Sequence, residues 1–341
     1  MITEDIGALS RDPTRQRALL SVVVPAYNES DVLVAFHRRL AAVLDGLAMD
    51  AEILFVDDGS HDDTLAVIRR LREFDRRVGV IALSRNFGKE VALTAGLDHA
   101  HGDAVVVIDA DLQDPPELIP QLIEHWHEGC DVVYAKRASR GGETFFKRVS
   151  AHVFYRLIQR FSQVGIPTDT GDFRLLSRRA VDALKKLREQ HRFMKGLFAW
   201  IGYPQKAVTY RRDARVAGHT KWNYWKLWNL ALDGITSFTT APLKAATCLG
   251  LVVTAAALLY AGLTLYHAIC GDPANGNAAL ILVVLFLGGV QLICIGVIGE
   301  YLGRMFDEAK HRPLYLIDCH EPARVRRVNA LPDRMRAGGN L

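Results

Sequence analysis

The sequence lacks the features of a disulfide-bonded, zinc-binding or nucleic-acid-binding protein. Its 341 residues include five cysteines, an odd number, and no C-x-x-C pair. A disulfide framework and a zinc ribbon are therefore not expected, and a reducing compartment fits best. The net charge of +4 is too small to indicate nucleic-acid binding. Because half of the residues are hydrophobic and only 23% are charged, a disordered chain is also excluded.

Two long runs contain no Asp, Glu, Lys or Arg, and both lie late in the chain. They comprise 26 residues at 245–270 and 22 residues at 278–299, with a polar turn between them. About 20 apolar residues are enough for a helix to cross a bilayer. The pattern predicts a transmembrane hairpin; the alternative is a buried helical hairpin in a soluble core.

The basic residues around this hairpin predict its orientation. The connecting turn has none, whereas both outer flanks carry them: Lys221, Lys226 and Lys244 before the first run, and Arg304, Lys310 and Arg312 after the second. Both flanks are therefore expected in the cytoplasm. The N-terminus begins with acidic residues and no apolar signal-peptide core, so we expect residues 1–242 to stay cytoplasmic.

The first part of the chain alternates between short apolar runs and helical patterns. Strands are predicted at 20–24, 52–56, 80–83, 104–108 and 131–134, and helices at 30–47, 61–76, 88–100 and from Pro116. This order is typical of a parallel sheet with helices on both faces. Ligands of such sheets bind beyond the carboxyl ends of the strands.

Polar clusters follow three of these strands, at 25–29, 57–60 and 109–114. No G-x-G-x-x-G or P-loop follows any strand, which excludes a dinucleotide fingerprint and an ATP-binding loop. Asp109 and Asp111 instead offer two hard oxygen donors, which suit a divalent cation on a diphosphate. Such pairs also cap helices and form turns, but three acidic strand ends together favour the binding site.

Several motifs together carry a family resemblance. They are VVVPAYNE (22–29), VDDGS (56–60), DADLQDPPE (109–117), TGDFRLLSR (170–178), RFMKGLFAWIGY (192–203), LALDGITSF (230–238) and GEYLGR (299–304). The chain resembles a family-2 glycosyltransferase of the membrane-bound polyprenyl-phosphate group, which includes bactoprenol glucosyltransferases and is related to dolichol-phosphate mannose synthases. The one departure is Thr220 in place of a Ser in the family's G-x-S-K-[YW], which keeps the hydroxyl.

The resemblance implies an α/β, A-type glycosyltransferase fold with a Rossmann-like, mostly parallel sheet, then membrane-proximal amphipathic helices and a two-helix transmembrane hairpin. The expected boundaries are an N-terminal tail at 1–18, the catalytic domain at 19–220, a membrane-proximal helix at 221–243, the hairpin at 244–303 and a cytoplasmic C-terminal tail at 304–341. Relatives imply a homo-tetramer.

The resemblance also assigns roles to individual residues. The nucleotide-sugar would be held by Pro25, Tyr27, Glu29, Asp57, Asp58, Asp109 and Gln113. Asp109 and Asp111 would bind Mg²⁺ or Mn²⁺. Asp172 would face the sugar near the reacting carbon, although a purely structural contact is the alternative. The acceptor phosphate would meet Arg137, Arg148, Arg215 and Lys221, which otherwise are positive-inside residues on anionic lipid.

Two segments predict a membrane-facing surface. Residues 143–162 have the spacing of a basic amphipathic helix in the membrane interface, or else of a core-facing helix with a solvated basic face. Residues 222–238 carry Trp222, Trp225 and Trp228, which suit the headgroup region.

The predicted function is the inverting, metal-dependent transfer of a hexose, in the first place glucose, from a UDP-sugar to polyprenyl (undecaprenyl) phosphate at the bacterial inner membrane. The alternatives are a 4-amino-arabinose or GDP-mannose donor, another acceptor, a processive polysaccharide synthase, or a non-catalytic scaffold. The synthase signature Q-x-x-R-W is missing; the nearest string is Gln190-His191-Arg192-Phe193.

Overall fold

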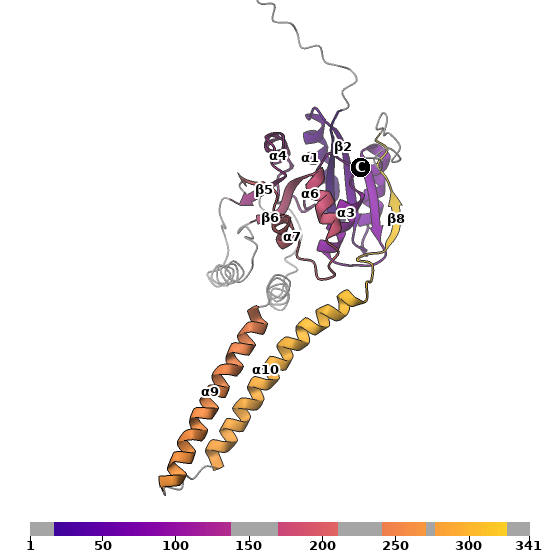
Figure 1. The fold of residues 1–341 in the computed structure, drawn as a ribbon. Coiled ribbons are helices and arrows are strands. Elements are labelled where there is room, and N and C mark those ends of the chain that lie inside the picture. Colours follow the sequence, from indigo (N-terminus) through magenta and orange to yellow (C-terminus); the bar gives the residue numbers. More distant parts are fainter. Residues whose placement is uncertain (1–16, 138–169, 211–240, 271–276, 326–341) are drawn as a thin grey trace, which may run out of the picture.

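One mixed sheet organises the first part of the chain in the computed structural model, which describes residues 17–137, 170–210, 241–270 and 277–325 (Figure 1). The strand order within the described residues is β7-β5-β6-β4-β1-β2-β3-β8. The strands are β1 Leu19–Ala26, β2 Asp50–Asp57, β3 Val78–Leu83, β4 Ala104–Val107, β5 Val132–Arg137, β6 Thr170–Ser177, β7 Gln205–Tyr210 and β8 Ile317–Glu321.

The sheet is mostly parallel, as predicted. The pairs β1–β2, β1–β4, β2–β3 and β5–β7 are parallel. Strand β6 runs antiparallel between β4 and β5, and β8 runs antiparallel along β3. Because β6 is antiparallel, its first residues lie at the same edge as the carboxyl ends of its neighbours.

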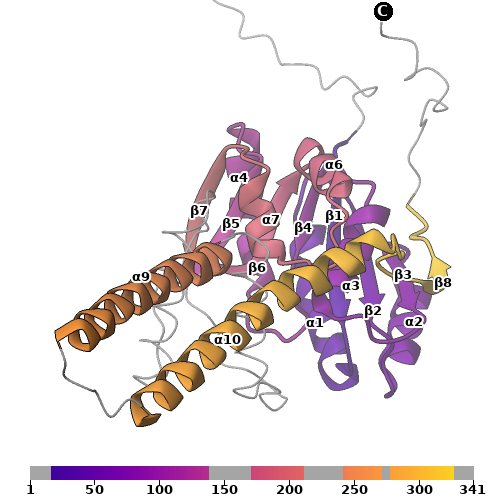
Figure 2. The ribbon, with the colours of Figure 1, turned by 60° about the horizontal axis from the view of Figure 1, so that its bottom comes forward.

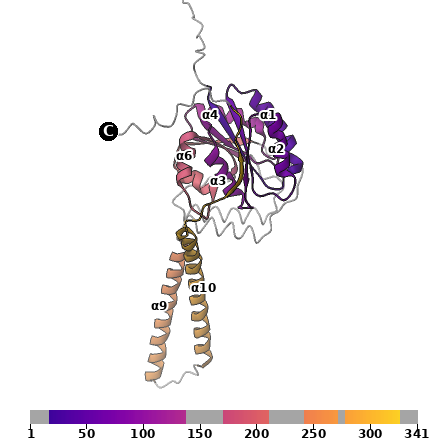
Figure 3. The ribbon, with the colours of Figure 1, turned by 90° about the vertical axis from the view of Figure 1, so that its right-hand side faces the viewer.

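Helices cover both faces of the sheet, as expected for buried parallel strands. The sheet is covered by α1 Ser30–Asp45, α2 Thr64–Phe74, α3 Lys89–His99, the 3₁₀ turn η1 Pro116–Leu118, α4 Ile119–His127, α6 Arg178–Lys186 and α7 Met194–Trp200. Two further helices, α9 Ala241–Cys270 and α10 Asn277–Ala309, follow in the chain. Buried side chains of α1, α2 and α4 form one core cluster, and those of α3, α6 and α7 form the other. Figure 3 shows α1 and α2 on one side of the sheet and α3 and α6 on the other.

Helix α3 packs unusually close to the sheet, at Gly96. A Cβ at this position would lie 2.2 Å from Val23 Cγ1 and 3.1 Å from Val56 Cγ2. The absence of a side chain therefore lets the helix approach β1 and β2 directly, which restricts its position over the strands.

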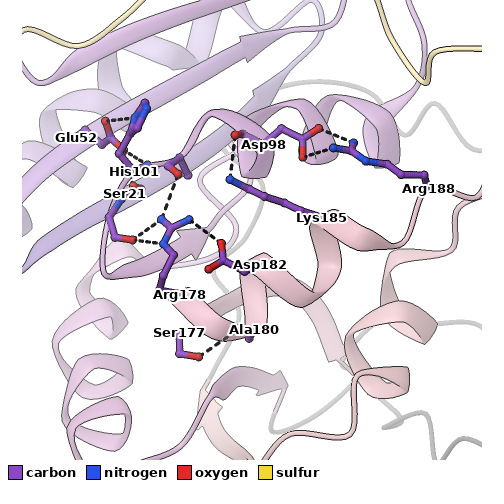
Figure 4. Close-up of polar contacts among 12 residues, drawn as sticks. Ser21, Glu52, Asp98, His101, Ser177, Arg178, Ala180, Asp182, Lys185 and Arg188 are labelled. Carbon is purple, nitrogen blue, oxygen red and sulfur yellow. Dashed lines mark hydrogen bonds and ion pairs between the residues drawn. The ribbon is translucent and has the colours of Figure 1, made fainter. Parts of the chain in front are cut away.

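The C-terminal end of α3 is bound by α6 and the segment that follows it (Figure 4). The Arg178 guanidinium donates to the carbonyl oxygen of Gly102 at 2.8 Å, and the Lys185 ammonium donates to the carbonyl oxygen of Asp98 at 3.0 Å. Arg188 binds both oxygens of the Asp98 carboxylate, at 2.7 and 3.1 Å. These bonds fix the end of α3 that lies away from its first residue, Lys89.

Helices α9 and α10 form a long hairpin that projects from the sheet domain (Figures 1 and 2). Large apolar side chains are exposed along both, including Leu258 and Leu292. Within α10, Phe286–Ala309 is long and apolar enough to cross a membrane, whereas the apolar stretch of α9, Ala246–Tyr260, is shorter. The predicted pair of helices is therefore present, and one of them meets the criterion for a span among the described residues.

The chain after this hairpin differs from the expected tail at 304–341. Helix α10 continues to Ala309, and β8 then adds an antiparallel edge strand to the sheet, with Ala82 opposite Cys319. The main-chain groups of β3 explain this pairing, since an uncovered edge strand offers unpaired donors and acceptors.

Candidate active site

The predicted site residues that the structure describes gather at one edge of the sheet, which we call the active edge. The register pairs Ala26 with Asp57, and Val107 with both Val23 and Arg174. The ends of β1, β2 and β4 therefore lie beside the start of β6. This edge carries Tyr27, Asp57, Asp58, Asp109, Asp111 and Asp172. The three acidic strand ends expected to converge do so.

The centre of this edge is an ammonium shared by two carboxylates. Lys89 Nζ lies 2.7 Å from Asp109 Oδ2 and 2.5 Å from Asp172 Oδ2. The second carboxylate oxygen, Asp172 Oδ1, is buried and has no hydrogen-bond partner in the part of the chain that the structure describes. The Asp172 side chain is only 12% exposed. Asp172 thus has one oxygen bound by Lys89 and one buried oxygen without a partner among the described residues.

The charges at this edge displace the pKa values of its members in opposite directions. Burial alone would raise the pKa of Asp172, but Lys89 and Lys195 more than offset it and hold the pKa well below its usual range. Burial keeps the pKa of Asp109 raised despite Lys89. Burial and the Asp172 charge raise the pKa of Glu90 to about 7. Such opposed shifts are typical of functional sites.

The two adjacent aspartates at the end of β2 have different environments. Both oxygens of Asp58 accept backbone N–H groups, from Phe87 at 2.7 Å and from Gly88 at 2.9 Å. Asp58 therefore holds the turn that begins α3. Within the described part of the chain, the backbone N–H that Asp57 accepts, from Ser60, lies farther away, at 3.3 and 3.4 Å from its two oxygens. Of the pair, Asp57 has the carboxylate better suited to a ligand.

The turn after β1 is fixed against the turn after β2. Asn28 has a positive φ of 53°, its N–H donates to Ser60 Oγ at 3.0 Å, and its Oδ1 accepts the His61 N–H at 2.9 Å. These bonds place Tyr27 with its ring edge-on to His61. Pro25 lies on β1, and Tyr27 and Glu29 lie in the turn that follows it.

The turn after β4 presents the two aspartates predicted to bind a metal. Asp111 Oδ1 accepts the N–H of Gln113 at 3.2 Å, Leu112 has a φ of 59°, and Gln113 is buried. Asp114 is buried and accepts a hydrogen bond from the Tyr210 hydroxyl, which joins this turn to β7.

The donor chemistry of Asp109 and Asp111 fits a hard divalent cation, which prefers carboxylate oxygens. Among the described residues, no group of three or more His, Cys, Asp or Glu side chains is arranged to hold a metal.

The predicted acceptor-binding residues fall partly at this edge. Arg137 ends β5 opposite Tyr210 of β7, and Lys136 pairs with Thr170, so Arg137 lies at the active edge. Arg148, Arg215, Lys221, the helix predicted at 143–162 and the segment 221–238 lie outside the described residues.

Two residues of the site were not predicted from the sequence. Lys89 contacts both central carboxylates, and its only sequence signal is its place after β3, at the edge where the acidic clusters lie. Arg174 is buried over the Phe198 ring and donates to the carbonyl oxygen of Gly171 at 2.8 Å and to that of Asp172 at 3.3 Å. It fixes the backbone that carries Asp172, and burial lowers its pKa to about 10.

Comparison with known proteins agrees with this geometry. Two family profiles match, "Glycosyl transferase family 2" over residues 21–185 and "GtrB C-terminal hairpin" over residues 241–305. A glycosyltransferase of Synechocystis is 53% identical over 299 residues, covering 87% of this chain and 94% of that protein. A bactoprenol glucosyl transferase of Shigella phage SfV is 48% identical over 299 residues, covering 87% and 97%.

Among solved structures, glucosyl-3-phosphoglycerate synthase from Mycobacterium tuberculosis is similar, with 23% identity, a TM-score of 0.45, and coverage of 64% of this chain and 78% of that chain. The match to the two profiles and to full-length relatives, together with the acidic sheet edge, identifies the protein as a glycosyltransferase of family 2, in the group that resembles the bactoprenol glucosyl transferases.

Proposed function

We propose that this enzyme transfers a hexose, in the first place glucose, from a UDP-sugar to a polyprenyl phosphate such as undecaprenyl phosphate. The observation that carries the proposal is the group of carboxylates around Lys89 at the sheet edge, on a chain that also bears an exposed apolar hairpin. The names of relatives that are 47–48% identical, bactoprenol glucosyl transferases, support a lipid phosphate acceptor.

The nucleotide part of the donor would bind on the turns after β1 and β2. Tyr27 offers an aromatic face for the base, and Glu29 and Asp57 offer carboxylates that accept N–H and O–H groups. Pro25, Asp58, Asp109 and Gln113 complete the set assigned to the nucleotide-sugar. Of these, Asp58 would act by holding the adjacent turn, since its carboxylate is occupied by backbone N–H groups.

The diphosphate would lie over the turn after β4. Asp111, together with Asp109, would hold Mg²⁺ or Mn²⁺, which when bound neutralises charge on the leaving group. Asp109 would share in this through Oδ1, while Oδ2 keeps its 2.7 Å contact with the Lys89 ammonium, because a carboxylate has two acceptor oxygens.

The transfer is a direct displacement at the anomeric carbon. A phosphate oxygen of the acceptor forms the new C–O bond while the bond to the UDP oxygen breaks, so that UDP leaves and the configuration inverts. The acceptor is already an anion at pH 7, and the reaction requires orientation more than proton removal. Asp172 would orient the reactants, and Arg137, Arg148, Arg215 and Lys221 would bind the acceptor phosphate.

The hairpin would keep the site at the membrane. Its exposed apolar side chains, with Phe286–Ala309 long enough to span, support insertion of α9 and α10 into the bilayer. We propose that both helices span the inner membrane, that the sheet domain lies in the cytoplasm, and that the protein assembles as a homo-tetramer.

The proposal is tested with the purified full chain and a panel of UDP-hexoses, GDP-mannose and UDP-4-amino-arabinose. Undecaprenyl phosphate is the acceptor, undecaprenol without phosphate is the matched control, and EDTA removes the metal. We expect one UDP-hexose to give a lipid product that requires both the phosphate and the metal. UDP binding without any lipid product would point to another acceptor, and no UDP binding would favour a scaffold.

A further inference from the structure

Lys89 is held in place from both ends of its helix and from the sheet. Asp58 binds the N–H groups of Phe87 and Gly88, directly before α3, and Gly96 fixes the height of the helix over the strands. The bonds from α6 fix its other end. A lysine on such a rigid element has its Cα position determined, although its four-carbon side chain is flexible.

The ammonium of Lys89 binds one oxygen of each central carboxylate. It joins Asp109, which follows β4, to Asp172, near the start of the antiparallel strand β6. Two carboxylates brought to one edge repel each other, and a cation between them removes this repulsion. Because Lys89 takes Asp172 Oδ2, the oxygen left to accept from a substrate group is Oδ1, which is buried and has no hydrogen-bond partner among the described residues.

We propose that Lys89 is a positioning residue for sugar transfer: its ammonium fixes the Asp172 carboxylate against Asp109, so that Asp172 Oδ1 faces the reacting sugar. The inference rests on the proposed function and deepens it. A positioning role predicts that loss of the ammonium slows the chemical step and leaves nucleotide binding nearly intact, since the nucleotide is assigned to the turns after β1 and β2.

The test compares Lys89→Met with Lys206→Met in the full chain. Lys206 is the matched control because its side chain is equally exposed, at 43%, and its ammonium pairs with one carboxylate instead of two, Glu128 at 2.8 Å. For Lys89→Met we expect kcat to fall roughly 100-fold, as for other misplacements near the reacting atoms. The Kd for UDP, measured with Mg²⁺ present, should stay within about threefold of the wild-type value. Lys89→Arg should recover part of kcat, and Lys206→Met should leave both values unchanged.

Two results would overturn the assignment. A tenfold or greater loss of UDP affinity with unchanged kcat at saturation would make Lys89 a donor ligand instead. Equal behaviour of Lys89→Met and Lys206→Met would show that the bridge has no role in transfer.

A second measurement separates failure of this inference from failure of the proposed function. Thermal melting without substrates is recorded for Lys89→Met, Asp172→Asn and the double variant. If Lys89 and Asp172 form the bridge, the melting temperature of the double variant should fall by less than the two single variants' losses added together. Strictly additive losses would contradict the bridge. This coupling decides the pairing of Lys89 with Asp172 even if the wild type transferred no sugar to the lipid.

Discussion

At the scale of single residues, neighbouring carboxylates at the active edge have different roles because their hydrogen-bond partners differ. Each oxygen of Asp58 accepts a backbone N–H at 2.7 or 2.9 Å, whereas the backbone N–H bonded to Asp57 among the described residues lies at 3.3 and 3.4 Å. In the sequence both are simply the aspartates of VDDGS, and nothing in that string separates them. Only the turn before α3, more than 25 positions further along the chain, gives Asp58 its structural role.

This difference predicts that substitutions at the two adjacent positions affect different properties, stability at one and UDP binding at the other. Asp58→Asn replaces one acceptor oxygen by a donor and should lower the free energy of unfolding by about 1–3 kcal/mol. Asp57→Asn should mainly weaken UDP binding, about tenfold, as expected for loss of a hydrogen bond from a charged group. Thermal melting and calorimetric titration with UDP measure the two effects. Equal loss of stability in both variants would contradict the distinction.

Glu90 predicts a pH dependence of stability. Its pKa is about 7 in the folded protein, above the ordinary value of 4.5, because burial and Asp172 disfavour its charge. The folded state then holds a proton that the unfolded state loses first, so stability falls as the pH rises from 4.5 to 7. A pKa of about 7 in place of 4.5 corresponds to roughly 3 kcal/mol of free energy of unfolding at most.

Glu90→Gln removes this penalty. The variant should melt at a higher temperature than wild type at pH 8. This difference in melting temperature, the gap between the two proteins, should become smaller as the pH falls towards 5. Melting curves at several pH values measure it, with Glu128→Gln on the exposed Lys206 pair as the control. A gap that stays constant across this pH range would contradict the assignment.

At the scale of elements, the sequence predicted most of the sheet because buried parallel strands are short apolar runs. The runs at 20–24, 52–56, 80–83 and 104–108 all lie within or overlap observed strands. The place of β6 was not predictable, since an antiparallel strand between β4 and β5 depends on pairing across more than 60 residues. Strand β8 was missed for a similar reason: IDCHE has an ordinary polar composition and becomes a strand by pairing with β3.

The close contact of α3 with the sheet gives a prediction for this element. Gly96→Ala should lower the free energy of unfolding by about 1–3 kcal/mol, because the added methyl would collide with Val23. It should also lower kcat, since a displaced α3 moves Lys89. Gly46→Ala is the control, because its methyl would meet only the Val43 carbonyl oxygen, at 3.4 Å. Loss of stability in both variants alike would argue against a special role of the α3 contact.

At the scale of the whole molecule, the hairpin and the sheet domain are joined by a small set of polar contacts as well as by the chain. The N–H of Gln190 donates to Glu308 Oε1 at 2.6 Å, and His191 Nε2 lies 3.1 Å from Asp307 Oδ2. The same segment leads to Met194, whose N–H donates to Glu90, the neighbour of Lys89. The C-terminal end of α10 thus contacts the segment that borders the active edge.

These contacts predict how the segment 187–193 responds to change in α10. The double substitution Asp307→Ala and Glu308→Ala should speed trypsin cleavage at Arg188 and Arg192 several-fold, since a segment without its anchors opens more often. Limited proteolysis of the full chain in detergent, read by mass spectrometry, measures the rate. Glu128→Ala is the control, and equal cleavage of the double variant and wild type would contradict the anchoring.

The most direct test of the account is the product formed from UDP-glucose and undecaprenyl phosphate by the full chain in detergent with Mg²⁺, identified by mass spectrometry. The account predicts a glucosylated lipid phosphate with wild type, no product with EDTA, and at least 100-fold slower formation with Asp172→Asn, as expected for a misplaced reacting group. Wild type that binds UDP-glucose and forms no lipid product, or Asp172→Asn that works at the wild-type rate, would contradict it.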